Sequence, residues 1–347
     1  IHSPSGGSDV TGSVSCSSST WSASALNLSG LSDDSAVTFN ATQTDSAGNT
    51  GTATQITIIK DTISPVLSIN AVSTISSSNA SSYAISGNCS SGDGNVSYTI
   101  HSPSGGSDVT GSVACSSSTW SISALNLSGL SDDSAVTFNA TQTDSAGNTG
   151  GATQMTAVKD TAAPVLSISA VSTISSSNES SYSISGSCST GDGNVSYTIH
   201  SPSGGSDVTG NVSCSSSTWS ANALNLSGLS DDSTVTFNAT QTDSAGNTGA
   251  ATQLTAIKDT AVPLVSINIP STVNSINYAA YAVTGTCSNG DGNVSYTIHS
   301  PSGGSDVTGA VACSGGSWSS GGISLAGLND DSGITFDASQ TDSFGNI

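Results

Sequence analysis

Apolar and polar side chains alternate along most of this chain. In residues 182–188, written YSISGSC, the positions Tyr182, Ile184, Gly186 and Cys188 fall on one side of an extended backbone, and serines fall on the other. A period of two is typical of half-buried β-strands, and no stretch has the period of an amphipathic helix. Turns rich in Gly and Asn separate these stretches about every 8 to 12 residues. The pattern predicts an all-β protein.

One strand-rich unit is repeated along the chain. The string IHSPSGGSD begins at Ile1, Ile100, Ile199 and Ile298, so the period is 99 residues, the size of a small domain. Seven strands are expected in each repeat, the first of them at 165–171 in the repeat that starts at 160. We predict a tandem array of seven-stranded immunoglobulin-like β-sandwiches. Complete repeats are expected at 61–159 and 160–258, the C-terminal part of one at 1–60, and one without its last strand at 259–347, as in an excerpt of a longer array.

The cysteines and tryptophans fall on the apolar phases of the strands. Cys188 and Cys214 are 26 positions apart and both point to the predicted core. This predicts the disulfides Cys89–Cys115, Cys188–Cys214 and Cys287–Cys313, with the partner of Cys16 upstream of the chain. A bridge between repeats, such as Cys115 with Cys188, also leaves one cysteine over, so counting does not exclude it. Trp21, Trp120, Trp219 and Trp318 are expected to pack in the core. Disulfides indicate an oxidising location, extracellular and either secreted or on a cell surface.

The charge balance is strongly acidic. The net charge is −21, with 24 acidic residues against three Lys and no Arg. Phosphate backbones and anionic membrane surfaces attract clustered Lys and Arg, so neither nucleic acid nor a membrane is an expected partner. No apolar run approaches the roughly 20 residues of a membrane helix. Cations are the natural partners of such a surface.

Several motifs resemble a known family. These are ISGSCSTGDGNVSYTI, TWS, VTFNATQTDSAGNTG and DTAAP, all within or next to the repeat at 160–258. Together they are similar to the bacterial immunoglobulin-like repeats of large secreted surface adhesins, and the resemblance covers the whole chain. Such repeats are mostly stalks, and similar adhesin repeats bind Ca²⁺ at their joints. The two cysteines depart from the family pattern, which is generally cysteine-free.

Carboxylates recur where consecutive repeats should meet. Strands of a sandwich alternate in direction, so three segments should lie at one end of a repeat. They are the connection to the preceding repeat, the loop between the second and third strands, and the loop between the sixth and seventh strands. Repulsion between close carboxylates favours a cation, and Ca²⁺ takes six to eight oxygen ligands. The predicted ligands are Asp61, Asp93, Asp144, Asp160, Asp192, Asp243, Asp259, Asp291 and Asp342, with Asp132, Asp133, Asp231 and Asp232 as further candidates and Asn194 and Asn247 as neutral donors. The alternative is that these residues cap turns and keep the surface soluble.

The expected function is structural. His200, Ser201 and Asp207 have the residue types of a hydrolase triad, but geometry defines a triad, and a turn is the expected role of this string. We therefore expect no enzyme but the stalk of an extracellular bacterial adhesin or surface fibre, with neighbouring repeats as partners. Two alternatives are a subunit of a self-assembling extracellular filament, whose partners are further copies, and a repeated module that binds carbohydrate or a host protein.

Overall fold

The computed structural model describes all residues, 1–347. The chain divides into two compact units, Ile1–Ala162 and Ala163–Ile347, which we describe one at a time. Apart from one short 3₁₀ turn, every regular element is a β-strand, which confirms the predicted fold class. No helix is long and apolar enough to cross a membrane.

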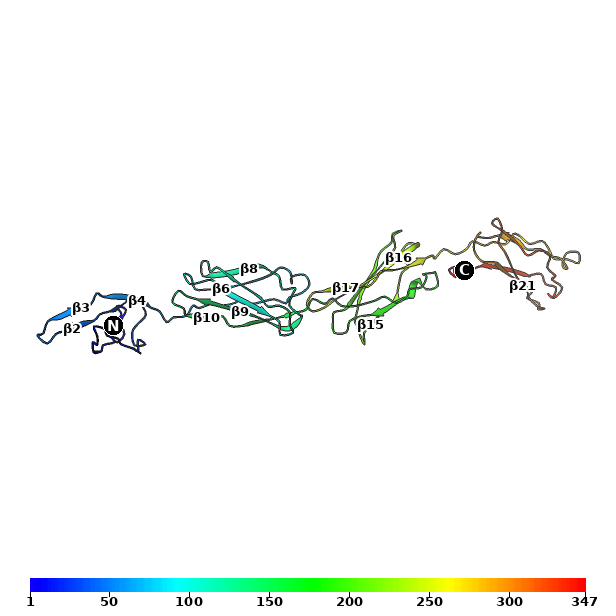
Figure 1. The fold of residues 1–347 in the computed structure, drawn as a ribbon. Coiled ribbons are helices and arrows are strands. Elements are labelled where there is room, and N and C mark those ends of the chain that lie inside the picture. Colours follow the sequence, from blue (N-terminus) through cyan, green and yellow to red (C-terminus); the bar gives the residue numbers. More distant parts are fainter. The chain divides into compact units, whose positions relative to one another are not determined.

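The first unit contains residues 1–60 and one complete repeat. In residues 1–60, β1 (Asp34–Phe39) pairs with β4 (Ile56–Lys60), and β2 (Thr42–Thr44) pairs with β3 (Thr50–Thr52). The complete repeat has two layers, of which one is β5 (Tyr83–Asn88) with β8 (Thr119–Leu125). The other has the order β10-β9-β6-β7, with β11 also on β9: β6 (Val96–His101), β7 (Val109–Val113), β9 (Asp133–Thr143), β10 (Thr149–Gly151) and β11 (Met155–Lys159). Figure 1 shows β6, β9 and β10 side by side, with β8 in the other layer.

The second unit repeats this topology. Its first layer pairs β12 (Tyr182–Ser187), which follows the 3₁₀ turn η1 (Glu179–Ser181), with β15 (Thr218–Leu224). Its second layer has the order β14-β13-β16-β17, with β18 on β16: β13 (Val195–His200), β14 (Val208–Val212), β16 (Asp232–Thr242), β17 (Thr248–Ala250) and β18 (Leu254–Lys258). The last repeat pairs β19 (Thr284–Thr286) with β22 (Ser317–Ser319), and orders β21 (Val307–Val311), β20 (Val294–His299) and β23 (Thr335–Gln340) in one sheet.

Two of the predicted strands differ in detail. The first, at 66–72 and 165–171, is extended but forms only alternate hydrogen bonds, such as Ser68 N–H to Asn88 O at 3.0 Å. The segment approaches so closely that a Cβ on Gly87 would lie 1.8 Å from Ser68 O, so only glycine fits there. The last strand of a repeat, predicted at 248–258 and equivalent to 149–159, is split in two: residues 152–154 separate β10 from β11.

The alternating apolar positions form a separate core in each complete repeat. In β12 the residues Tyr182, Ile184 and Gly186 are buried and the residues between them are exposed, as predicted. Trp120, Trp219 and Trp318 are buried, as predicted, and each donates its indole N–H to a backbone carbonyl of the first extended segment. Trp21 contradicts the prediction, since it is 58% exposed. The segment that covers Trp120 has no counterpart in this sequence for Trp21.

The three predicted disulfides are confirmed. Cys89–Cys115, Cys188–Cys214 and Cys287–Cys313 join residues within one repeat, and Cys16 is unpaired and exposed. Cys89 follows β5 in one layer and Cys115 follows β7 in the other, so each bridge ties the two layers together. The alternative pairing between repeats is thereby excluded in this structure.

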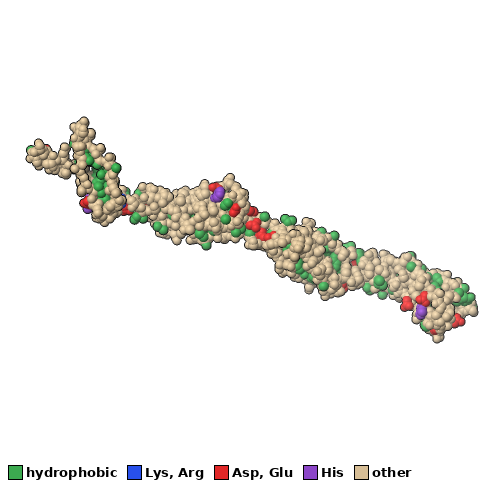
Figure 2. All heavy atoms as spheres, turned by 90° about the horizontal axis from the view of Figure 1, so that it is seen from below, with side chains coloured by type: hydrophobic (Ala, Val, Ile, Leu, Met, Phe, Trp, Pro, Cys, Tyr) green, Lys and Arg blue, Asp and Glu red, His purple; other side chains and the backbone are tan.

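The surface is polar but carries few charges. Figure 2 shows a face made mainly of backbone and uncharged side chains, with acidic side chains in small groups. Two of the three lysines are not part of this surface, because Lys159 and Lys258 are each only 3% exposed.

Candidate functional site at the joints between repeats

β4, β11 and β18 each end at a lysine that is followed by Asp and Thr, and we call this Lys-Asp-Thr triplet the joint: 60–62, 159–161 and 258–260. One aspartate holds both outer residues of the joint. Asp132 accepts hydrogen bonds from Lys159 Nζ at 2.7 Å, from Thr161 N–H at 2.9 Å and from Thr161 Oγ1. The corresponding contacts recur at Asp33 with Lys60 and Thr62, and at Asp231 with Lys258 and Thr260. We call this arrangement the lysine clamp.

Burial of the lysine makes the clamp energetically important. The Lys159 side chain is 2% exposed, whereas that of Asp132 is 37% exposed. A buried ammonium group loses its hydration and depends on its partner to offset that loss. Lys258 has a second partner, since Glu179 Oε2 lies 3.0 Å from its Nζ, in addition to Asp231 at 3.0 Å. In the preceding repeat Ala80 stands where Glu179 would be, so Lys159 depends on Asp132 alone.

The pKa values of the clamp residues favour their charged forms. A hydrogen bond from Lys60, with others from Thr62, lowers the pKa of Asp33 to about 2. Burial works to raise the pKa of Asp132, but hydrogen bonds from Lys159 and Thr161 outweigh it, so this pKa lies below its usual range. Burial likewise works to lower the pKa of Lys258, and its hydrogen bonds to Glu179 and Asp231 reverse the shift.

The central residue of the joint is held through its backbone by the repeat that precedes it. Asp259 N–H donates to Ile174 O at 2.9 Å, and Ile174 N–H donates to Ile257 O at 2.8 Å, so Ile174 extends the sheet edge beside β18. Asp160 N–H makes the same bond to Ile75 O in the first unit. Ile75 and Ile174 are fully buried. The joint therefore continues the last strand of its repeat and is not a free linker.

The carbonyl of the same residue is held by the repeat that follows. In the turn at 144–148, the Asp144 carboxylate accepts hydrogen bonds from Ala146 N–H, Asn148 N–H and Asn148 Nδ2. Asn148 Nδ2 also donates to Asp61 O, at 3.1 Å. In the second unit, Asn346 Nδ2 donates to Asp342 Oδ2 at 2.7 Å and to Asp259 O at 3.0 Å.

The loops that carry the predicted calcium ligands lie side by side, but the side chains of these ligands are not gathered around a common point. Gly94 N–H donates to Thr143 O, which brings the loop of Asp93 beside the turn of Asp144, and the same bond recurs from Gly193 and Gly292. The carboxylates cap turns instead. Asp61, Asp160 and Asp259 each accept the N–H two residues on. The same holds for Asp144, Asp243 and Asp342, and for the further candidates Asp133 and Asp232, which also accept a serine hydroxyl.

No group of three or more His, Cys, Asp or Glu side chains is placed to hold a metal ion. Two of the further candidates, Asp132 and Asp231, are already bonded to lysine. As placed, these residues do not supply the six to eight oxygens of a calcium shell. Calcium at the joints stays a prediction, for Asp192 and Asp291 as for the others.

The histidine of each repeat is paired, but not as a triad. His200 Nδ1 lies 2.7 Å from Asp207 Oδ1, whereas the Ser201 hydroxyl donates to Ser230 O, away from the ring. The same His-Asp pair recurs at His2, His101 and His299. In the second unit this pair joins the two ends of the turn between β13 and β14.

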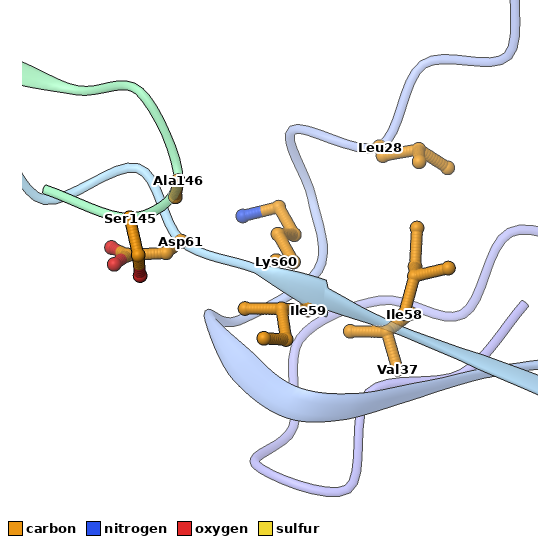
Figure 3. A pocket seen from close by; sticks show the side chains of 8 residues that line it. All are labelled: Leu28, Val37, Ile58, Ile59, Lys60, Asp61, Ser145 and Ala146. Atoms are coloured by element: carbon orange, nitrogen blue, oxygen red, sulfur yellow. The ribbon is translucent and has the colours of Figure 1, made fainter.

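A depression of about 340 Å³ lies beside the first joint. Its lining includes Leu28, Val37 and Ile58, and Ser145 and Ala146 of the following turn lie at its Asp61 side (Figure 3). In the complete repeat, the fully buried Ile75 packs beside the counterparts of Ile59 and Lys60. The sequence contains no counterpart of Ile75 for residues 1–60, which explains this depression as an unfilled core position.

The comparisons with known proteins give structural neighbours only. No protein-family profile and no curated protein matches the chain. A tetra-tandem repeat in the extending region of a large adhesion protein is 22% identical, over 92% of this chain and 81% of that one, with a TM-score of 0.32. A 1.5-MDa bacterial ice-binding adhesin is also 22% identical, over 81% of this chain and 93% of that structure, with a TM-score of 0.37. Fibronectin(III)-like modules of Clostridium thermocellum CbhA are 11% identical over 56% and 95%, with a TM-score of 0.29.

Proposed function

We propose that this chain is the non-catalytic structural stalk of an extracellular bacterial adhesin or surface fibre. The observation that carries the proposal is that the backbone and side chains of the joint are hydrogen-bonded to the repeats on both sides. In residues 258–260 the lysine side chain, the aspartate N–H, the aspartate C=O and the threonine N–H are all hydrogen-bonded. A flexible linker between independent binding modules has no need of such bonds, whereas a stalk that must keep its direction does.

The construction of each repeat supports this function. A complete repeat has its own core and its own disulfide, so repeats can be added without a new fold. A loop closed over 26 residues stabilises a fold by about 3 to 4 kcal/mol in the chain-entropy model. Disulfides within a repeat also suit an oxidising, extracellular location.

Electron microscopy of the purified chain tests this proposal. Single, separate particles of one length, at every protein concentration, are expected of a stalk. Ordered bundles with a helical repeat would overturn the stalk and favour a filament subunit. Binding to glycans or host surface proteins by the repeats themselves would favour the third alternative.

Calcium at the joints is a separate prediction and is tested separately. Isothermal titration of the full chain at millimolar Ca²⁺, before and after removal of bound metal with EDTA, measures it directly. Heat of binding at about one ion per joint would support the prediction, and no heat would contradict it.

A further inference from the structure

We propose that the asparagine of each Thr-Asp-Ser-X-Gly-Asn turn is a recognition residue for the preceding repeat, and that its amide bridges consecutive repeats without a metal. This inference rests on the proposed stalk function and names the surface by which its repeats contact each other. Asn346 carries the complete arrangement. Its Nδ2 donates to Asp259 O in the joint, and its Oδ1 accepts the N–H of Ser176, in the preceding repeat, at 2.8 Å.

The orientation of the Asn346 amide is fixed by its partners. Nδ2 faces two oxygen acceptors, Asp342 Oδ2 and Asp259 O, while Oδ1 faces an N–H donor. An amide turned the other way would place oxygen against two oxygens and NH₂ against an N–H. The Asp342 carboxylate thus orients the Asn346 amide through a hydrogen bond.

The partner loop in the preceding repeat is also held in shape by hydrogen bonds of its own. Asn178 Oδ1 accepts the N–H of Ser175, and Asn178 Nδ2 donates to Thr173 O, both at 2.9 Å. These bonds close residues 173–178 into a compact loop, from which Ser176 N–H donates to Asn346. The adjacent Ile174 bonds to Asp259. One loop therefore contacts both the joint and the next repeat.

The chain offers its own comparison series for this asparagine. Asn49 occupies the same turn, with the same bonds to Asp45, but no repeat precedes it in this sequence, and it is exposed. Asn148 is preceded by residues 1–60 and by the joint at 60–62, to which it bonds, but this sequence contains no counterpart of the 173–178 loop before it, and it is half-buried. Asn346 is preceded by a complete repeat and is fully buried. Burial thus increases as the preceding repeat becomes more complete, although the turn is unchanged.

Amide hydrogen exchange in the full oxidised chain, followed by NMR in the presence of EDTA, tests the bridge. Asn346→Ala should speed exchange of the Ser176 amide at least about tenfold, because its only acceptor is removed. Asn346→Asp should do so at least as strongly, since it sets a carboxylate against Asp342. The matched control Asn49→Ala should leave Ser176 unchanged. The Phe344 amide, which donates to Asp342, should stay protected in all variants if the turn persists.

Small-angle scattering of the same chains gives the second readout. The combined change Asn148→Ala and Asn346→Ala should broaden the distribution of distances within the chain, whereas Asn49→Ala should not. Ser176 exchange and scattering that both equal the wild type would overturn the bridge. The stalk proposal would survive that result, because it is judged on the microscopy of the unmodified chain. A broadening that appears only when Ca²⁺ is removed, in wild type and variants alike, would also overturn the bridge and favour calcium.

Discussion

The substitution Asp132→Asn tests the lysine clamp alone, because it removes the charge that faces Lys159 and leaves the rest of the fold unchanged. Lys159 would keep its charge in a site where its side chain is 2% exposed, without a counter-charge. Breaking a fully buried pair in this way costs about 3 to 5 kcal/mol. Because Asp132 is 37% exposed, water screens part of the interaction, and we expect about 2 kcal/mol. Asp231→Asn should cost about half as much, since Glu179 remains beside Lys258.

Hydrogen exchange with mass spectrometry measures both changes in the full chain, because β11 and β18 give peptides of different sequence. The expected loss at Asp132→Asn corresponds to about thirtyfold faster exchange of β11, against about fivefold for β18 at Asp231→Asn. Lys159→Met should cost less than Asp132→Asn, because it removes the buried charge. Equal and small effects of the two aspartate changes, or a larger cost for Lys159→Met, would refute the reasoning.

The fold and the clamp can be tested further by a change of pH, by removal of a disulfide and by substitution of a glycine. The pKa of Asp33 is lowered from 3.8 to about 2, so the clamp contributes stability above about pH 4 and loses it as the pH falls towards 2. The protection of the Thr62 amide, relative to its intrinsic exchange rate at each pH, should fall over this range in wild type but not in Asp33→Asn. Replacing Cys188 and Cys214 by Ser should lower the free energy of unfolding of that repeat by about 3 kcal/mol in chemical denaturation; an unchanged midpoint would contradict this. Gly87→Ala should destabilise its repeat by about 1 to 3 kcal/mol, because the methyl group meets Ser68 O, whereas Gly129→Ala, with open space around its Cβ, should be neutral by tryptophan fluorescence.

Local patterns were enough to predict the fold. Alternation identified the buried faces, and the spacing of Cys188 and Cys214 with their phase in the strands predicted the disulfide. The exceptions have physical causes. The first predicted strand depends on close approach to Gly87, which is a tertiary contact, and Trp21 depends on a covering segment that this sequence does not include.

The sequence predicted where the joint lies, but not the hydrogen bonds that hold it, and calcium there stays a prediction. The sequence marks Asp, Lys, Thr and Asn there through their recurrence, and repulsion between carboxylates suggested a cation. What single-sequence reasoning could not supply is the pairing over distance. Asp132 is bonded to Lys159 and Thr161, and Asn346 to the loop of another repeat, so carboxylates and amides that look like cation ligands are used as hydrogen-bond partners. Recurrence of the asparagine in all four turns was the available signal, and it was interpreted as a neutral ligand.

The central claim is that hydrogen bonds hold consecutive repeats together at the joint. Nitrogen-15 relaxation of the full oxidised chain, in EDTA, tests it most directly by comparing repeats 160–258 and 259–347. Amides of both repeats should report one common anisotropic tumbling, and residues 258–262 should be as rigid as the strands beside them. Independent tumbling of the two repeats, with fast motion confined to those joint residues, would contradict the claim.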